Sequence, residues 1–125
     1  MVQYFLDSSV ILDILAGNQR SVKAVKLVSN AELVTNVICY CEVLNTADMN
    51  RRIKAESLLA RFMVFPVSLA ECDTACRMQD SCRKRGEYVR TSDCLIAASA
   101  KNIGAILVTS DSDFERIEGL EKIVL

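Results

Sequence analysis

Short apolar runs alternate with longer segments of helical periodicity along this chain. Runs of a few mostly apolar residues are typical of buried strands. Five such runs lie at residues 2–6, 32–34, 62–67, 105–108 and 122–125. Strands that alternate with helices form a parallel sheet covered on both faces. We therefore expect an α/β fold with a central parallel sheet of about five short strands, covered by helices on both faces.

Between these runs, apolar residues return every three or four positions, which is the spacing of one helical face. This pattern holds for residues 8–15, 22–28, 37–44, 50–61, 68–85 and 91–103, and residues 111–116 suggest a single helical turn. Gly17, Gly86 and Gly104 follow three of these segments, and Thr35 and Asn36 precede another as capping residues. Because the chain shows no linker or repeat, residues 1–125 are expected to form one domain.

The composition agrees with an ordinary globular domain. Of 125 residues, 51% are hydrophobic and 25% are charged, which is enough to bury a core. No apolar run approaches the roughly 20 residues needed to span a bilayer, and the apolar start before Asp7 is too short for a signal peptide. We therefore expect a cytoplasmic protein without a membrane partner. The net charge of -1 means that any binding of nucleic acid must rest on local basic patches.

The chain has six cysteines and no histidine. Most of these cysteines lie inside apolar or helical patterns, where a free thiol behaves as a small hydrophobic group. Reduced, structural cysteines are therefore expected, although a disulfide through Cys72 or Cys76 stays open. A zinc site is not favoured, because the chain lacks both a CxxC pair and a histidine ligand.

Four acidic residues stand at places where a parallel sheet would bring them together. Asp7 and Asp111 follow predicted strands, Asp93 begins a predicted helix, and Glu42 lies within another. Ligands of such sheets bind beyond the carboxyl ends of the strands, so we expect these acids to share one cleft. Apolar neighbours from Cys39 to Leu44 argue against a merely solvent-facing role for Glu42.

Converging carboxylates need either protons or a cation. Two unit charges about 4 Å apart repel by roughly 4 kcal/mol at an effective dielectric near 20. Oxygen ligands suit Mg²⁺ or Mn²⁺, and a metal-bound water is a good nucleophile for phosphoryl displacement. Simpler interpretations stay open: Asp7 and Asp93 as helix caps, and Asp111 and Asp113 as residues of a polar turn.

Three segments of the chain resemble a known family. Residues 4–12 read YFLDSSVIL, which is similar to the opening strand and first acidic residue of PIN-domain ribonucleases. Residues 92–100 and 104–114 read SDCLIAASA and GAILVTSDSDF, and they resemble the C-terminal signature of the same family. In style and length the chain looks like a VapC-type toxin of a type II toxin–antitoxin system. The resemblance covers essentially the whole chain.

This resemblance implies a single PIN-like domain with Mg²⁺- or Mn²⁺-dependent endoribonuclease activity. It implies a set of catalytic metal ligands, with a further acid sharing the role of the last one, namely Asp7, Glu42, Asp93 and Asp111, with Asp113. Ser9 resembles a residue that supports the first aspartate, and Thr109 is expected to support the fourth. Cys94 departs from the alanine expected after the third aspartate, but it is small enough to leave the site intact.

The resemblance also implies an RNA substrate, a cognate antitoxin protein and a homodimer. Arg83, Arg85 and Arg90 are candidates to bind RNA phosphates, and apolar helix surfaces within residues 8–28 and 37–60 are candidates for the protein contacts. A PIN-type nuclease of RNA processing or quality control is the alternative role. A phosphoacceptor signalling domain is disfavoured because residues 109–113 contain no lysine. A haloacid-type phosphatase is disfavoured because Ser9, not aspartate, stands two residues after Asp7.

Overall fold

The computed structural model describes residues 2–28 and 30–125; Met1 and Ser29 of the predicted domain lie outside the described residues. The elements, in chain order, are β1 (Gln3–Leu6), α1 (Ser8–Leu15), α2 (Gln19–Leu27), β2 (Glu32–Asn36), α3 (Val37–Leu44), α4 (Met49–Leu59), β3 (Met63–Phe65), α5 (Leu69–Lys84), α6 (Thr91–Asn102), β4 (Ile106–Thr109), the 3₁₀ helix η1 (Ser112–Arg116) and β5 (Lys122–Val124). Within the described ranges, no helix is long and apolar enough to cross a membrane.

The strands of the described chain form one five-stranded parallel sheet in the order β3-β2-β1-β4-β5. This arrangement confirms the predicted α/β fold with a central parallel sheet. The chain passes from β1 to β2 and β3 on one side, and then crosses to β4 on the other side of β1. The sheet therefore changes direction of winding between β1 and β4, which is where ligands of such sheets bind.

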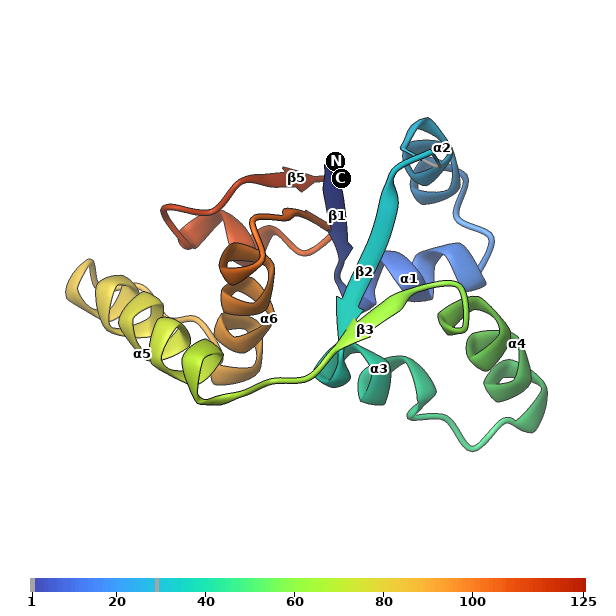
Figure 1. Ribbon diagram of the computed structural model, residues 1–125, viewed down its shortest axis with the longest axis horizontal. Coiled ribbons are helices and arrows are strands. Elements are labelled where there is room, and N and C mark those ends of the chain that lie inside the picture. Colours follow the sequence, from blue (N-terminus) through green and yellow to red (C-terminus); the bar gives the residue numbers. More distant parts are fainter. Residues whose placement is uncertain (1, 29) are drawn as a thin grey trace.

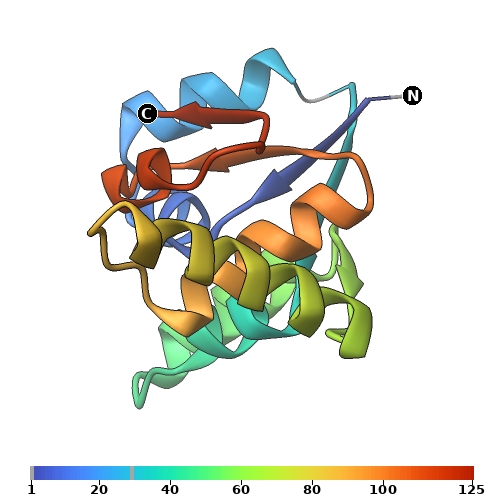
Figure 2. The ribbon, with the colours of Figure 1, turned by 90° about the vertical axis from the view of Figure 1, so that its left-hand side faces the viewer.

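Helices cover both faces of the sheet, as predicted. Successive strand residues point to opposite faces, so Phe5 and Leu107 join one buried cluster while Leu6 and Val108 join the other. Helices α5 and α6 pack on the first face, and α1 and α4 pack on the second (Figure 1). In Figure 2 the side of the molecule that carries α5 and α6 faces the viewer, and these two helices lie in the foreground.

Two of the differences between expected and observed element boundaries have clear local reasons. The strand expected at residues 62–67 is confined to Met63–Phe65, and Pro66 lacks the N–H needed to continue a ladder. The helix expected from residue 22 begins at Gln19. Its start is fixed by Asn18, whose side chain accepts a hydrogen bond from the Ser21 N–H at 3.2 Å, a side-chain cap that stabilises a helix start.

All six cysteines carry free thiols. Cys39, Cys82 and Cys94 are buried, whereas Cys41 and Cys76 are exposed. This distribution agrees with the expected structural role of the cysteines inside apolar patterns, because three of them belong to a buried cluster with strand and helix residues of the core.

Candidate metal centre at the carboxyl ends of the strands

Asp7 follows β1 directly and is 3% exposed. Its backbone N–H donates to the Val108 carbonyl at 3.0 Å, so the residue extends the pairing of β1 with β4. Its Oδ2 accepts hydrogen bonds from Ser9 Oγ at 2.7 Å and Thr109 Oγ1 at 2.8 Å. Asp7 stands at the N-cap position of α1, but within the described chain its side chain makes no capping hydrogen bond. Hydroxyl groups, rather than helix N–H groups, therefore orient this carboxylate.

Thr109 links the ends of the neighbouring strands β1 and β4. The residue is completely buried, and its hydroxyl accepts from the Asp111 N–H at 3.0 Å while it donates to Asp7. Ser9 Oγ accepts from the Ser110 N–H at 3.1 Å. The contact expected of Ser9 with Asp7 is thus present. Thr109, expected near the fourth acid, contacts the backbone of Asp111 and the carboxylate of Asp7.

Three carboxylates gather beside this pair of strand ends. Asp93, Asp111 and Asp113 each offer one oxygen, and these oxygens lie within 4.8 Å of one another. Asp93 is the third residue of α6, whose N-cap residue is Arg90, so Asp93 is not the cap of that helix. Asp111 precedes η1 and accepts a hydrogen bond from the Asp113 N–H at 2.9 Å. A helix start and a strand end thus supply one group of oxygen ligands.

The charges of this group are only partly balanced. Burial raises the pKa of Asp93, the nearby Arg90 opposes that rise, and the negative charges of Asp111 and Asp7 add to it. Arg90 Nε lies 3.3 Å from Asp93 Oδ2, and its Nη2 lies 4.0 Å from Asp111 Oδ2. Arg116 Nη2 lies 3.7 Å from Asp113 Oδ1. Two guanidinium groups therefore face three carboxylates, and the arrangement attracts further positive charge.

Glu42 reaches the site through Ser8. The Ser8 hydroxyl lies 3.1 Å from Glu42 Oε1 and 3.4 Å from Asp7 Oδ1, so its single proton serves both carboxylates. Contrary to the expectation from its apolar neighbours, Glu42 is exposed. The reason is helical phase: Cys39 and Val43, one turn apart, take the buried face, and Glu42 points away from it.

We call Asp7, Glu42, Asp93, Asp111 and Asp113 the acidic edge. Ser8 contacts both Glu42 and Asp7. Thr109 links Asp7 to the backbone of Asp111. Arg90 lies between Asp111 and Asp93. The predicted acids are therefore connected at one end of the sheet.

Sequence reasoning treated Asn36 only as a helix cap, and the structure gives it a second contact. Its Oδ1 accepts from the Cys39 N–H at 3.0 Å, as a cap does, and its Nδ2 donates to Ser99 Oγ at 2.9 Å. Asn36 is completely buried and so ties the start of α3 to α6. Its place at the end of a predicted strand was the available sequence signal.

Cys39, which the sequence marked only as apolar, lies against the first aspartate. Its Sγ is 4.0 Å from Asp7 Oδ1. Burial, together with the neighbouring Asp7 charge, raises the pKa of the Cys39 thiol to about 12. The thiol therefore stays protonated and can donate to the carboxylate.

The three arginines predicted to bind RNA take different positions. Arg90 contacts the acidic edge, as described above. Arg83 pairs with Asp80 on α5 at 3.3 Å. Arg85 pairs with Glu118 at 3.6 Å and donates to the Arg116 carbonyl. The structure thus brings Arg90 to the predicted acids, whereas Arg83 and Arg85 contact other groups.

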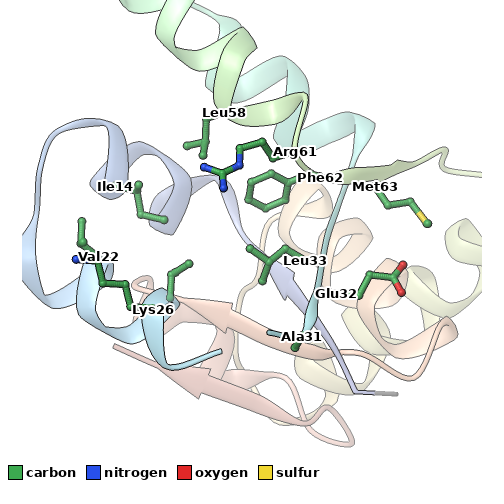
Figure 3. A pocket seen from close by; sticks show the side chains of 11 residues that line it. Ile14, Val22, Lys26, Ala31, Glu32, Leu33, Leu58, Arg61, Phe62 and Met63 are labelled. Carbon is green, nitrogen blue, oxygen red and sulfur yellow. The ribbon is translucent and has the colours of Figure 1, made fainter. Parts of the chain in front are cut away.

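A separate apolar groove of about 980 Å³ lies near the amino ends of β2 and β3. Figure 3 shows its side chains, which come from α1, α2, the end of α4, β2, β3 and the segments that lead into the two strands. Apolar members are Ile14, Val22, Val25, Ala31, Leu33, Leu58, Phe62 and Met63, with Lys26, Glu32 and Arg61 among them. We call this feature the apolar groove. Five of its eleven lining residues belong to the helix surfaces that the sequence proposed for protein contacts, and the other six lie in and before β2 and β3.

Similar folds are found among solved toxin–antitoxin proteins. The chain is similar to VapBC2 from Rickettsia felis, solved bound to a DNA fragment from their promoter, with a TM-score of 0.85 and 19% identity over 99% of each chain. It is similar to VapBC-1 from nontypeable Haemophilus influenzae, with a TM-score of 0.81 and 24% identity over 98% of each chain. VapBC-5 from Mycobacterium tuberculosis, a member of the VapBC family of toxin-antitoxin systems, gives a TM-score of 0.76 and 24% identity over 100% of each chain.

These identities are low, so the likeness to solved structures establishes the fold. Among curated proteins, none matches the chain in sequence. The family comparison reaches further, because the model described as PIN domain matches residues 4–120. That match includes the strand ends and helix starts that carry the acidic edge. With nearly its whole length accounted for in this way, the chain belongs to the PIN domain family.

Proposed function

We propose that this protein is a Mg²⁺- or Mn²⁺-dependent endoribonuclease and the toxin of a toxin–antitoxin pair. The observation that carries the proposal is the connected acidic edge at the winding change between β1 and β4. Membership of the PIN domain family supports a hydrolase of nucleic acid. The proposal includes the prediction that residues 1–125 act as one domain in the cytoplasm, where RNA is available.

The side chains fit a hard divalent cation. The groups of the acidic edge are oxygen donors, and three of them converge within 4.8 Å. Such donors select Mg²⁺ or Mn²⁺ over softer metals. We propose that Asp7, Asp93 and Asp111 hold the cation, that Asp113 shares the role of Asp111, and that Glu42 completes the set through its contact with Ser8.

The residues around the acids have distinct tasks in the proposed reaction. Ser9 and Thr109 fix Asp7 by donating to one oxygen, which leaves Oδ1 with only longer contacts, to Ser8 and Cys39. Burial of Asp93 weakens its solvation and strengthens its electrostatic interactions. When bound, the divalent cation supplies an activated water and neutralises charge on the phosphate. The exposed Arg90 and Glu42 mark the solvent side, from which the RNA backbone would approach.

Cleavage of RNA by the purified protein tests this function. We expect cleavage with Mg²⁺ or Mn²⁺, none with EDTA, and none with Asp7→Ala or Asp93→Asn. The matched control is Asp73→Asn, because Asp73 is an exposed aspartate of α5. Circular dichroism would establish that each variant is folded. Full activity in EDTA, or in folded Asp93→Asn protein, would contradict the proposal. Mapping the cleaved ends in total RNA would identify the target.

We further propose that the apolar groove binds a segment of the antitoxin. The similar solved proteins include members of toxin–antitoxin systems. The groove offers apolar side chains from five elements, and Lys26 and Arg61 stand exposed among them. These features suit an amphipathic segment with apolar anchors and an acidic residue opposite the two cations. None of the residues of the acidic edge lines the groove, so a segment bound there would not contact those carboxylates.

Gene context and co-purification distinguish a toxin from the alternative, a PIN nuclease of RNA processing or quality control. A toxin should co-purify with the product of a short neighbouring frame that has a DNA-binding amino-terminal part.

We also propose that the protein pairs with itself. Sedimentation at micromolar concentration should then give the mass of a homodimer, and a monomer under these conditions contradicts self-pairing.

A further inference from the structure

Arg90 lies between carboxylates that belong to different elements. The guanidinium contacts Asp93, within its own helix start, at 3.3 Å, and it reaches Asp111, after β4, at 4.0 Å. A pair between residues three apart at a helix start is common. The second contact is not a consequence of helix geometry, because Asp111 comes from another part of the fold.

We propose that Arg90 is an internal counter-ion that the divalent cation displaces, and that it thereby sets the metal affinity of the acidic edge. This inference rests on the proposed function, because it assumes that Asp93 and Asp111 hold the cation. Arg90 is thus a positioning and affinity-setting residue, rather than only a contact for RNA phosphate.

The contacts explain why Arg90 and a metal ion compete. Arg90 Nε donates a hydrogen bond to Asp93 Oδ2, and its Nη2 lies 4.0 Å from Asp111 Oδ2. Asp93 and Asp111 are two of the three acids whose oxygens converge. A dication at these oxygens would repel a guanidinium held in the same place. Occupancy by one cation therefore disfavours the other.

Exposure indicates which partner moves. The Arg90 side chain is 62% exposed, whereas that of Asp93 is 8% exposed. Because the guanidinium is largely exposed, water can solvate it when it leaves, and the incoming cation takes over its role as counter-ion of Asp93. The Asp93 side chain is enclosed by the fold, so the arginine is the partner with room to move. Displacement would release the guanidinium at the mouth of the site, where it can bind a phosphate.

Arg116 provides a graded comparison within the same site. It pairs with Asp113 at 3.7 Å, and both residues belong to η1. Among the ion pairs of the described residues, Arg116 faces one acid of the convergent group while Arg90 faces two. Removal of Arg116 should therefore change metal affinity in the same direction as removal of Arg90, and by less.

The direct test is the affinity of the full-length protein for Mn²⁺ without RNA, by calorimetry or by the electron paramagnetic resonance of free Mn²⁺. We expect Arg90→Gln to lower the Kd about tenfold, which is the order expected for removing a unit charge beside a dication. Arg51→Gln is the control, because Arg51 also pairs with an aspartate three residues away at a helix start, and its Kd should equal that of wild type. An unchanged or raised Kd in Arg90→Gln overturns the inference.

Thermal unfolding gives a second readout that needs no activity. In EDTA, Arg90→Gln should unfold at a lower temperature than wild type, because the acids lose their counter-ion. Saturating Mn²⁺ should raise the Tm of Arg90→Gln by more than it raises the Tm of wild type. If Arg90→Gln does not fold, Arg90→Lys can be used instead. Lysine keeps the positive charge but lacks the guanidinium nitrogens that contact Asp93 and Asp111 together. Its Kd for Mn²⁺ should therefore lie below that of wild type. Equal Kd values for Arg90→Lys and wild type then count against the inference.

Asp93→Asn separates this inference from the proposed function. If it binds Mn²⁺ as tightly as wild type, the proposed metal site itself fails. If Asp93→Asn weakens Mn²⁺ binding but Arg90→Gln does not strengthen it, the metal site stands and only the counter-ion role of Arg90 is rejected.

Discussion

At the centre of the acidic edge, polar side chains are buried and contact one another, whereas in the apolar groove hydrophobic side chains remain partly open to solvent. Asp7 and Thr109 are at most 3% exposed and share a hydrogen bond of 2.8 Å. In the groove, Val22 and Phe62 are only half-buried. Buried polar groups must form hydrogen bonds within the protein. Exposed apolar surface is stabilised when another molecule covers it and removes it from water. The first region therefore suits the proposed ion, and the second suits the proposed partner chain.

The largest expected effect is the loss of catalysis at the acidic edge without loss of binding at the groove. We expect Asp93→Asn to reduce RNA cleavage by about 100-fold or more, which is the scale for removing an electrostatic group that acts on the transition state. Antitoxin affinity should be unchanged, because Asp93 is not part of the groove. Cleavage assays and calorimetry on the same preparation check both. A parallel loss of both properties would mean that the two regions are not independent.

The converse change removes binding and keeps catalysis. Val22→Asp places a charge in the apolar groove, and we expect antitoxin affinity to fall roughly 30-fold or more, as for an interface hot spot. RNA cleavage by the free protein should stay at the wild-type rate. Leu27→Asp is the matched control, because Leu27 belongs to the same helix but does not line the groove. Equal losses in both variants would remove the groove from the antitoxin interface.

A smaller effect concerns the support of Asp7. Thr109→Val keeps the shape of the side chain but removes the donor to Asp7 and the acceptor for the Asp111 N–H. A buried group left without its hydrogen bond costs about 1–3 kcal/mol, so we expect the free energy of unfolding in urea to fall by about that amount. Cleavage should fall as well. Thr74→Val, on α5, should have little effect on either measurement, because Thr74 lies at the surface contact with Asn102.

The smallest effect is a difference in thiol chemistry. Because the pKa of Cys39 is raised to about 12 and that of Cys94 to about 11, both thiols stay protonated in the folded protein at pH 8. Iodoacetamide should therefore modify exposed Cys41 and Cys76 first, as mass spectrometry can show. For such groups the folded state binds its proton more tightly than the unfolded state does. Stability should then decline as pH rises above the ordinary thiol value of about 9. Rapid modification of folded protein at Cys39 would contradict this.

Much of the fold was predictable because the short apolar runs are well separated by helical periodicity. The run at residues 105–108 and the strand Ile106–Thr109 differ by one residue at each end. The first strand and the last helix start were similarly clear, so the edge that carries Asp7, Asp93 and Asp111 followed from topology. What remained uncertain was the length of weak elements such as residues 62–67, where pairing rather than composition sets the ends.

The contacts between side chains were harder to predict. Sequence spacing does not reveal that one threonine would serve Asp7 and the backbone of Asp111, since this depends on the register of β1 with β4. The exposure of Glu42 was mistaken because apolar neighbours on both sides hide the phase of a helix only eight residues long. The dual contact of Arg90 was likewise invisible, because it requires a helix start and a strand end to meet.

Asp7 and Thr109 share a hydrogen bond although they stand 102 positions apart. During translation, Asp7 is therefore made early and obtains this partner only after the whole of β4 has left the ribosome. A polypeptide that ends before β4 lacks Thr109 and Asp111 and cannot assemble the acidic edge.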